Sequence, residues 1–297
     1  EPDPLNITFN DNSTVTLDCN GDADGVIDID IAGGTSPYTY SWTTSDGSGL
    51  ESAQEDQNGL TAGTYDITVT DANGCTASSS YTIDEPDALN VGISISSEIT
   101  CYGLTNGELE ANPTGGTTDY SYQWNDGASQ TTKIADGLGP GSYQVTVTDA
   151  NGCIATASES LSEPDSMSLN SYSSSDITCN GADNGEIHLD VSGGTGAKSY
   201  TLNPGNLLNN YGDFNNLGPD IYTVTVTDEN GCPGPEITDT INEPDALNFD
   251  LIDHTDITGC NGDATGSISV DGSGGTGTLT YTLSTGISNT SGDFNGL

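Results

Sequence analysis

Seven cysteines recur at matching positions of a repeated segment, some early in each copy and some late. Their thiols are the groups in this sequence best suited to form specific bonds. Pairing each early cysteine with the next late one leaves only Cys260, whose partner we expect beyond Leu297. Buried free thiols are the alternative, and no Cys-x-x-Cys spacing indicates zinc. Regular, pairable cysteines in small domains favour an oxidising, extracellular setting. The early cysteines are Cys19, Cys101, Cys179 and Cys260, and the late ones are Cys75, Cys153 and Cys232.

Two groups of oxygen-bearing side chains are candidates for binding Ca²⁺, the one cofactor that the sequence suggests. Asn20, Asp22 and Asp24 match the first half of a calcium loop, although no glutamate completes an EF-hand and a polar turn is the alternative. The second group lies where one copy of a repeat meets the next, and a simple Pro-Asp turn is its alternative. Its members are Asp71, Asn73, Glu85 and Asp87, then Asp149, Glu163 and Asp165, then Asp228, Glu243 and Asp245.

The sequence lacks a unique constellation of the kind that catalysis requires. Its two histidines, His188 and His254, belong to no metalloprotease motif, and nearly every suggestive carboxylate has copies elsewhere. We therefore expect no enzyme activity. Three tyrosines outside the repeat pattern, Tyr102, Tyr172 and Tyr211, are candidate ligand contacts, with isolated exposed aromatics as the alternative.

The net charge restricts the partners. Forty-five Asp and Glu stand against two Lys and Arg, giving a formal net charge of −43. This balance excludes a broad basic surface for nucleic acid or anionic lipid. No apolar run approaches the roughly 18 residues of a spanning helix, so membrane insertion is not expected.

A repeat of about 80 residues organises the chain. Its best-kept part, here called the closing phrase, occurs at residues 64–75, 142–153 and 221–232, and Glu-Pro-Asp recurs at Glu1, Glu85, Glu163 and Glu243. We predict three full repeats and a fourth that lacks its last strands. Repeat 1 comprises residues 1–84, repeat 2 residues 85–162, repeat 3 residues 163–242 and repeat 4 residues 243–297.

Period-2 alternation predicts strands throughout, because alternate side chains of a strand point to opposite faces. In the first closing phrase Tyr65, Ile67 and Val69 face one way, while the residues between them are polar. Asn73-Gly74 supplies a turn with positive φ. The Leu60-x-x-Gly63-x-Tyr65 pattern is typical of the corner before strand F of immunoglobulin-like domains. We predict an all-β chain, a tandem array of immunoglobulin-like antiparallel β-sandwiches.

A disulfide within one repeat constrains the strand count. The early cysteine ends the first strand and the late cysteine begins the last, so both must lie at the same end of the sandwich. Residues 125–142 have room for one strand, near residues 129–135, which gives an even count of four crossings between Cys101 and Cys153. An ordinary seven-strand sandwich has an odd number of crossings between the two cysteines. It would place them at opposite ends and so forbid the bond. We expect the bond, because closing a loop of roughly 50 residues contributes a few kcal/mol.

The order of these motifs resembles the SprB repeat of gliding-motility adhesins and other large surface proteins of Bacteroidota. The phrases that carry the resemblance are Thr178-Cys-Asn-Gly181, Gly33-Gly-Thr-Ser-Pro-Tyr-Thr-Tyr-Ser-Trp42, residues 137–153 and Glu85-Pro-Asp87. The resemblance implies export by the type IX secretion system and display as a long adhesin. It also implies O-glycosylation at Ser166 and Thr240. Separately, Asn6, Asn12 and Asn289 begin N-glycosylation sequons.

We therefore expect a non-enzymatic segment of an extracellular, cell-surface adhesin or filament that binds surfaces or glycans and self-assembles laterally or end to end. One alternative is a spacer or carbohydrate-binding module of a large secreted hydrolase. The other is a calcium-stiffened stalk with no adhesive surface of its own.

Overall fold

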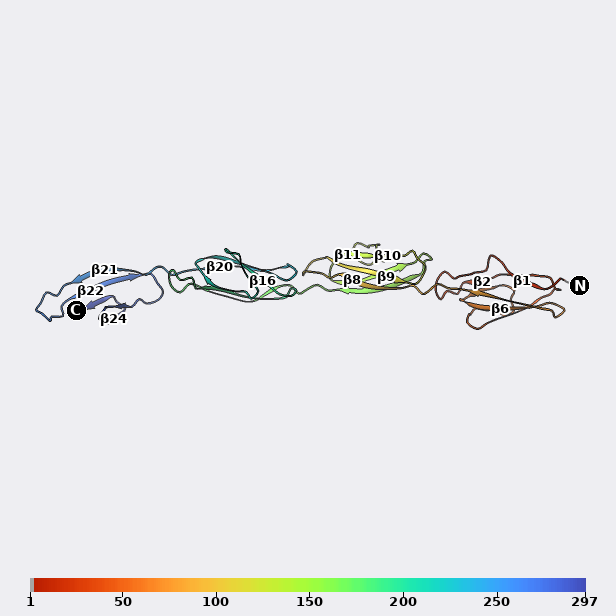
Figure 1. Ribbon diagram of the computed structural model, residues 1–297, viewed down its shortest axis with the longest axis horizontal. Coiled ribbons are helices and arrows are strands. Elements are labelled where there is room, and N and C mark those ends of the chain that lie inside the picture. Colours follow the sequence, from red (N-terminus) through yellow and green to blue (C-terminus); the bar gives the residue numbers. More distant parts are fainter. Residues whose placement is uncertain (1–2) are drawn as a thin grey trace. The chain divides into compact units, whose positions relative to one another are not determined.

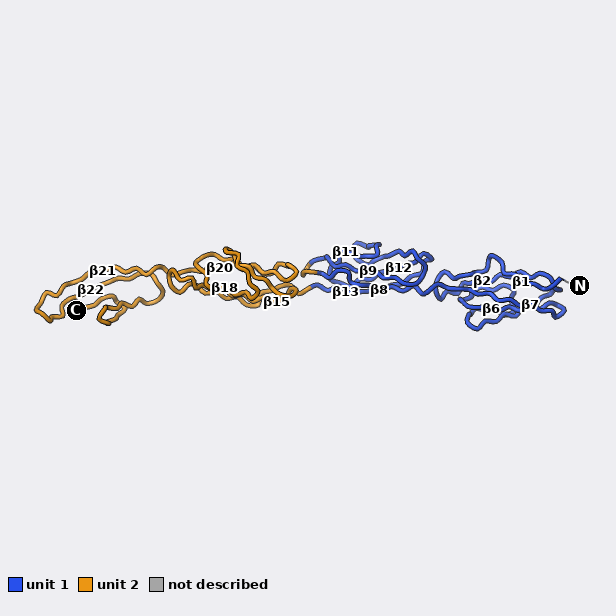
Figure 2. The backbone as a smooth tube through the Cα atoms, viewed as in Figure 1, with its two compact units in different colours: residues 1–99, 104–163 blue, residues 100–103, 164–297 orange. Residues whose placement is uncertain are grey.

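The computed structural model describes residues 3–297, and within that range every regular element is a β-strand (Figure 1). The all-β prediction is confirmed. The chain divides into two compact units (Figure 2): unit 1 holds residues 1–99 and 104–163, and unit 2 holds residues 100–103 and 164–297. The short segment Thr100–Gly103 thus groups with unit 2, although it follows the first strand of repeat 2.

In unit 1, repeat 1 is a two-layer antiparallel sandwich. One layer holds the pairs β1–β3 and β2–β5, and the other holds the sheet β4-β6-β7. Tyr65 and Ile67 are buried between the layers, as their alternation predicts, and Trp42 is buried with them. The strands are β1 (Asn6–Phe9), β2 (Gly25–Ile27), β3 (Ile29–Ala32), β4 (Thr39–Thr44), β5 (Gln57–Leu60), β6 (Gly63–Thr70) and β7 (Thr76–Ile83).

Repeat 2, also in unit 1, packs the sheet β11-β9-β8 against the sheet β10-β12-β13. Trp124 and Val145 lie in its core. The strands are β8 (Asn90–Ser97), β9 (Gly107–Thr114), β10 (Ser121–Trp124), β11 (Ile134–Leu138), β12 (Gly141–Thr148) and β13 (Ile154–Leu161).

In unit 2, repeat 3 packs the sheet β14-β15-β18 against the sheet β17-β16-β19-β20. Its core includes Leu189, Leu202 and Val224. The strands are β14 (Ser168–Ser175), β15 (Gly185–Ser192), β16 (Ser199–Asn203), β17 (Leu207–Asn209), β18 (Asp213–Leu217), β19 (Asp220–Thr227) and β20 (Pro233–Ile241).

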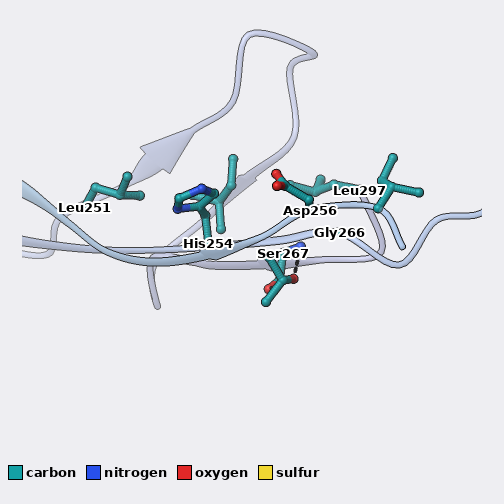
Figure 3. A pocket seen from close by; sticks show the side chains of 9 residues that line it. Leu251, His254, Asp256, Gly266, Ser267 and Leu297 are labelled. Carbon is teal, nitrogen blue, oxygen red and sulfur yellow. Dashed lines mark hydrogen bonds between the residues drawn. The ribbon is translucent and has the colours of Figure 1, made fainter. Parts of the chain in front are cut away.

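Repeat 4 has only the sheet β21-β22-β25 and the strand pair β23-β24. Ile257 is 55% exposed, whereas its counterparts Ile99 and Ile177 are 3% exposed. Figure 3 shows Leu251, His254 and Asp256 beside an open cavity of this repeat. The strands are β21 (Asn248–Thr255), β22 (Ser267–Ser273), β23 (Tyr281–Thr282), β24 (Ser288–Asn289) and β25 (Asp293–Asn295).

The corner before the sixth strand of repeat 1 is the predicted tyrosine corner. The hydroxyl of the buried Tyr65 donates a hydrogen bond to the carbonyl oxygen of Thr61 at 2.7 Å. Tyr143 and Tyr222 make the same bond four residues back, to Gly139 at 2.9 Å and Gly218 at 3.2 Å. This bond lets a tyrosine ring fill the core while its hydroxyl group stays satisfied.

The four strand crossings predicted between Cys101 and Cys153 are wrong, since the strands make three. β10 is antiparallel to β12 and β11 is antiparallel to β9, and both β9 and β12 run from the end near Leu138 toward the end near Asp149. β10 and β11 therefore run in the same direction. β10 ends at Trp124, which pairs with Val145, and β11 begins at Ile134, which pairs with Glu110. The two short strands therefore follow one another along the sandwich and together make a single crossing from one end to the other.

The structure has no helix among residues 3–297, and therefore none in that range that could span a membrane.

Candidate functional site: the cysteine clasp between repeats

Two disulfides join the early cysteine of one repeat to the late cysteine of the following repeat. Cys19 pairs with Cys153 inside unit 1, and Cys101 pairs with Cys232 inside unit 2, with Cα–Cα distances of 5.7 and 5.6 Å. The pairing predicted within each repeat is therefore wrong. Cys75 and Cys179, which it assigned to bonds, are exposed free thiols, and so is Cys260.

The direction of the strands explains why the bond within a repeat fails. Cys75 precedes β7, whereas the early segment lies beyond the end of that strand, where Leu17 N–H donates to Asp84 at 2.8 Å. Eight strand residues span about 26 Å. A disulfide needs Cα atoms less than about 7 Å apart. An odd number of crossings thus turns each early cysteine toward the next repeat.

An aspartate builds the turn that presents each late cysteine. The Asp149 carboxylate accepts the N–H groups of Thr117 at 2.8 Å, Cys153 at 2.9 Å and Asn151 at 3.0 Å. These bonds, of which that from Thr117 is the strongest influence, hold the pKa of Asp149 below its usual range against the effect of burial. The same turn forms at Asp71 and Asp228.

An asparagine amide joins each disulfide across the repeat boundary. Asn151 Nδ2 donates to the carbonyl oxygen of Asp18 at 2.9 Å, next to the bond from Cys19 to Cys153. In unit 2, Asn230 Nδ2 donates to Thr100 at 3.0 Å. We call this combination of disulfide and amide bond the clasp. Its sequence signature is the Asn in Asp-x-Asn-Gly-Cys. The sequence indicated this asparagine as a turn former and, at Asn73, as a calcium ligand, but not as a link between repeats.

The early turn and Glu-Pro-Asp meet at the same boundary. Gly21 N–H donates to Glu85 Oε2 at 2.6 Å, and Asn20 Nδ2 donates to the Pro86 carbonyl at 3.0 Å. In unit 2, Gly181 N–H donates to Glu243 at 2.9 Å and Asn180 to Pro244 at 3.1 Å. The glutamate and the early asparagine thus hold a linker, which gives both residues a structural role.

The proposed calcium ligands do not converge. Among residues 3–297 no three His, Cys, Asp or Glu side chains are grouped to hold a metal ion. Asp22 instead accepts the Cys19 N–H at 3.1 Å, and Asn73 Nδ2 donates to Thr35. All three predicted groupings at the repeat boundaries are wrong. Asp71, Asp149 and Asp228 each precede a strand, β7, β13 or β20, and lie with a threonine at its start, whereas Glu85, Glu163 and Glu243 follow the end of that strand. Calcium binding by the individual residues stays a prediction: Asn20, Asp22, Asp24, Asp71, Asn73, Glu85, Asp87, Asp149, Glu163, Asp165, Asp228, Glu243 and Asp245.

The three candidate contact tyrosines differ in exposure. Tyr211 is 79% exposed, and Tyr102 is 61% exposed beside the second clasp. Tyr172 is 37% exposed and its hydroxyl donates to Asp239, while burial and that carboxylate raise its pKa. Tyr102 and Tyr211 are the freer surfaces for a ligand.

The predicted glycosylation residues also lie in different settings. Ser166, Thr240, Asn6 and Asn12 are exposed, and Asn12 Nδ2 donates to Asp28 at 2.9 Å. Asn289 is half-buried and its Nδ2 donates to the Asp293 carbonyl at 2.7 Å. Modification at these five positions stays a prediction.

The model of the SprB repeat matches the chain four times, at residues 12–47, 93–129, 171–207 and 253–287. The chain therefore belongs to the SprB-repeat family, as its motifs predict. No curated protein matches the sequence.

Solved structures with a similar arrangement of strands include three N-terminal domains of the Hoc outer capsid protein of bacteriophage RB49, at 17% identity and a TM-score of 0.41. That alignment covers 80% of this chain and 97% of the phage chain. Immunoglobulin domains 1–5 of Sidekick-1 align at 12% identity and a TM-score of 0.36, over 81% of this chain and 58% of that one. The N-terminal eight Ig domains of DSCAM align at 11% identity and a TM-score of 0.31, over 92% and 52%.

Proposed function

We propose that this chain is a non-enzymatic, load-bearing segment of an extracellular surface adhesin or filament, in which one clasp ties repeat 1 to repeat 2 and another ties repeat 2 to repeat 3. The observation that carries the proposal is that both disulfides leave one repeat and enter the following one. A disulfide inside a domain stabilises that domain, whereas one between repeats also carries tension past their boundary.

The chemistry around the clasp supports this role. Each turn residue has a mechanical part: the aspartate orders the turn, the asparagine bonds the neighbouring repeat, and the cysteine closes the covalent link. The cavities beside the two clasps are small, about 220 and 160 Å³. Pockets for drug-sized ligands measure roughly 300 to 1,000 Å³. These junctions are thus better suited to hold repeats than to bind a substrate.

The composition supports an exposed location. Forty-five acidic side chains against two basic ones keep copies of the chain apart by repulsion, as suits a soluble surface array. Disulfides persist outside the reducing cytosol. Adhesion would then use features that differ among the repeats, such as the exposed Tyr102 and Tyr211.

Peptide mapping of the non-reduced protein by mass spectrometry tests the carrying observation. We expect peptides linked through Cys19–Cys153 and Cys101–Cys232, with Cys75 and Cys179 alkylated as free thiols. Linked Cys19–Cys75 and Cys101–Cys153 peptides would remove the basis for load transfer between repeats.

Incubation of the purified chain with glycans and proteins tests the absence of catalysis. We expect no turnover. Cleavage that one point substitution abolishes, with the fold intact by circular dichroism, would replace the proposal with an enzyme. Glycan-array binding that Tyr211→Ala removes and Tyr81→Phe leaves unchanged would place the adhesive surface on repeat 3.

A further inference from the structure

The two clasps differ in how far solvent reaches their cysteines. In the first clasp, Cys19 and Cys153 are both half-buried. In the second clasp, Cys101 is half-buried, whereas Cys232 is only 6% exposed. A disulfide opens when a thiolate attacks one of its sulfurs, so the rate depends on access to those sulfurs. The first clasp therefore offers two routes of attack, and the second offers one.

The side chains around the two clasps also differ, although the same kind of turn carries the late cysteine in both. The cavity beside the first clasp measures about 220 Å³, and the one beside the second measures about 160 Å³. Three matching positions of the two linings carry different residues. From the first clasp to the second, Tyr102 replaces Asn20, Met167 replaces Leu89 and Pro233 replaces Ile154.

Met167 fills the space beside the strand that begins directly after Cys232. Its side chain packs against the core of repeat 3. A Cβ atom placed on Gly234 would lie 3.1 Å from Met167 Sδ, and one placed on Gly194 would lie 2.8 Å from Met167 Cγ. A flexible thioether suits such an irregular gap. Met167 thus lies closely against the backbone two residues beyond the buried cysteine.

The burial of Cys232 hinders both ways of opening the second clasp. A thiol can reach the Cys232 sulfur only through the surrounding side chains. Attack on the Cys101 sulfur instead releases the Cys232 thiolate at a buried position, which disfavours a charged group. The Asp228 carboxylate, which accepts the Cys232 N–H at 2.9 Å, adds like-charge repulsion. Asp149 has the matching place in the first clasp, so the burial of the cysteine is what distinguishes the two.

We propose that the clasps form a graded redox release, in which a dithiol reductant opens Cys19–Cys153 before Cys101–Cys232. A reductant thiolate attacks one clasp sulfur, and the other cysteine leaves as a thiolate and takes up a proton. The second thiolate of the reductant then attacks the mixed disulfide and frees the first cysteine, which is also protonated. The clasp gains two electrons, and the dithiol becomes a cyclic disulfide.

The order of release decides which joint yields first. Under reducing conditions repeats 1 and 2 lose their covalent link while repeats 2 and 3 remain joined through Cys101–Cys232. The chain would then lengthen in two steps under load. This proposal rests on the load-bearing function, because it concerns the order in which load-bearing bonds open.

The test follows both clasps of the full oxidised chain in one reaction. Free thiols are first blocked with N-ethylmaleimide, dithiothreitol is added under native conditions, and samples are alkylated at intervals for peptide mapping. We expect Cys19–Cys153 to disappear at least tenfold faster, through an intermediate that keeps Cys101–Cys232. Equal rates, or earlier loss of Cys101–Cys232, would overturn the graded release and leave the load-bearing function standing. Linked Cys19–Cys75 peptides before reduction would instead remove both proposals.

A variant with exchanged neighbours tests the physical cause. Tyr102→Asn, Met167→Leu and Pro233→Ile together give the second clasp the three neighbours of the first. We expect reduction of its disulfide to become at least fivefold faster, with the fold retained by circular dichroism. Tyr211→Asn is the control, because Tyr211 is exposed and lines neither clasp cavity, and it should leave both rates unchanged. An unchanged rate in the folded triple variant would overturn shielding by these side chains.

The dependence on reductant concentration supplies a second readout that needs no variant. Direct attack on the half-buried first clasp predicts a rate of loss of Cys19–Cys153 that is proportional to the dithiothreitol concentration. A rate that does not rise with dithiothreitol would mean that unit 1 must unfold before the bond is reached. That result would overturn the access of the reductant as the basis of the order.

Discussion

At the scale of single residues, the aspartate of the closing phrase is the main organiser of the clasp. Asp228 is 5% exposed, and its carboxylate accepts the N–H groups of Thr195, Asn230 and Cys232. Burial raises the pKa of Asp228, but these hydrogen bonds outweigh it and hold the pKa below its usual range. The ionised form is therefore the one that the fold selects.

We expect Asp228→Asn to destabilise repeat 3 by about 1 to 3 kcal/mol, the usual cost of unpaired buried hydrogen-bonding groups. The amide keeps one acceptor oxygen and turns an NH₂ group toward a backbone donor. Urea denaturation measures the change. Glu186→Gln, which removes an exposed charge on β15, should stay within about 0.5 kcal/mol. Equal stability of the Asp228→Asn and Glu186→Gln variants would contradict the assigned role.

The stability difference between the native chain and Asp228→Asn should depend on pH. A lowered pKa in the folded state means that Asp228 stabilises the fold above its unfolded-state pKa of about 3.9. This contribution disappears as the pH falls through the lower folded-state pKa. The difference should thus be constant from pH 7 to about pH 5 and shrink below pH 4. A difference that persists at pH 2 would mean that the charge is not what the turn uses.

Residue patterns predicted the turn but not the bonds that it makes. Asp-x-Asn-Gly marks a tight turn from local preferences alone, and the core row of Tyr65, Ile67 and Val69 follows from alternation. The partner of Asn151 is the carbonyl of Asp18, 133 residues away. A local sequence pattern cannot identify a hydrogen-bond partner so far away in the sequence. Asn151 could therefore be identified only as a turn residue.

At the scale of elements, one shared crossing decides the pairing of the cysteines. The prediction of a strand between Trp124 and the closing phrase was right in number, and β11 lies close to the predicted place. The direction of β11 could not be predicted. After Trp124 the chain passes from one sheet to the other partway along the sandwich, and not at the end where a strand would reverse direction. The same residues then give an odd count of crossings, and the early cysteine turns outward.

We expect Cys153→Ser to lower the stability of unit 1 by roughly 2 to 5 kcal/mol, because the bond to Cys19 closes a loop of 134 residues. Thermal unfolding under non-reducing conditions measures the loss. Cys75→Ser is the matched control at the same position of repeat 1, and it should change stability by less than about 0.5 kcal/mol, since Cys75 is free. Equal losses in the two variants would favour pairing within repeats.

At the scale of the whole molecule, the charge of −43 opposes compaction, so added cations should stabilise the chain by screening. We expect CaCl₂ and MgCl₂ at equal concentration to raise the Tm by the same amount within about 1 °C. The reason is that screening depends on the charge of the cation, which is the same for the two salts. A markedly larger rise with calcium would indicate a selective site and revive the stiffened-stalk alternative.

The two clasps overlap along the sequence, and this overlap sets how far the chain can stretch. The shortest covalent path runs from Glu1 to Cys19, crosses to Cys153, returns to Cys101 and crosses to Cys232 before it reaches Leu297. Less than half of the 297 residues lie on that path. A fully extended chain gains about 3.3 to 3.6 Å per residue, so the clasps limit its length directly.

We expect single-molecule pulling between the termini to extend the oxidised chain to roughly half or less of the length reached after reduction. Cys75→Ser should leave the oxidised length unchanged, because Cys75 is not on the covalent path through the clasps. Cys153→Ser should lengthen it, since Cys101–Cys232 is then the one remaining shortcut. If Cys75→Ser lengthened the oxidised chain as much as Cys153→Ser does, tension would run through bonds inside repeats, and the clasp would have no load-bearing role.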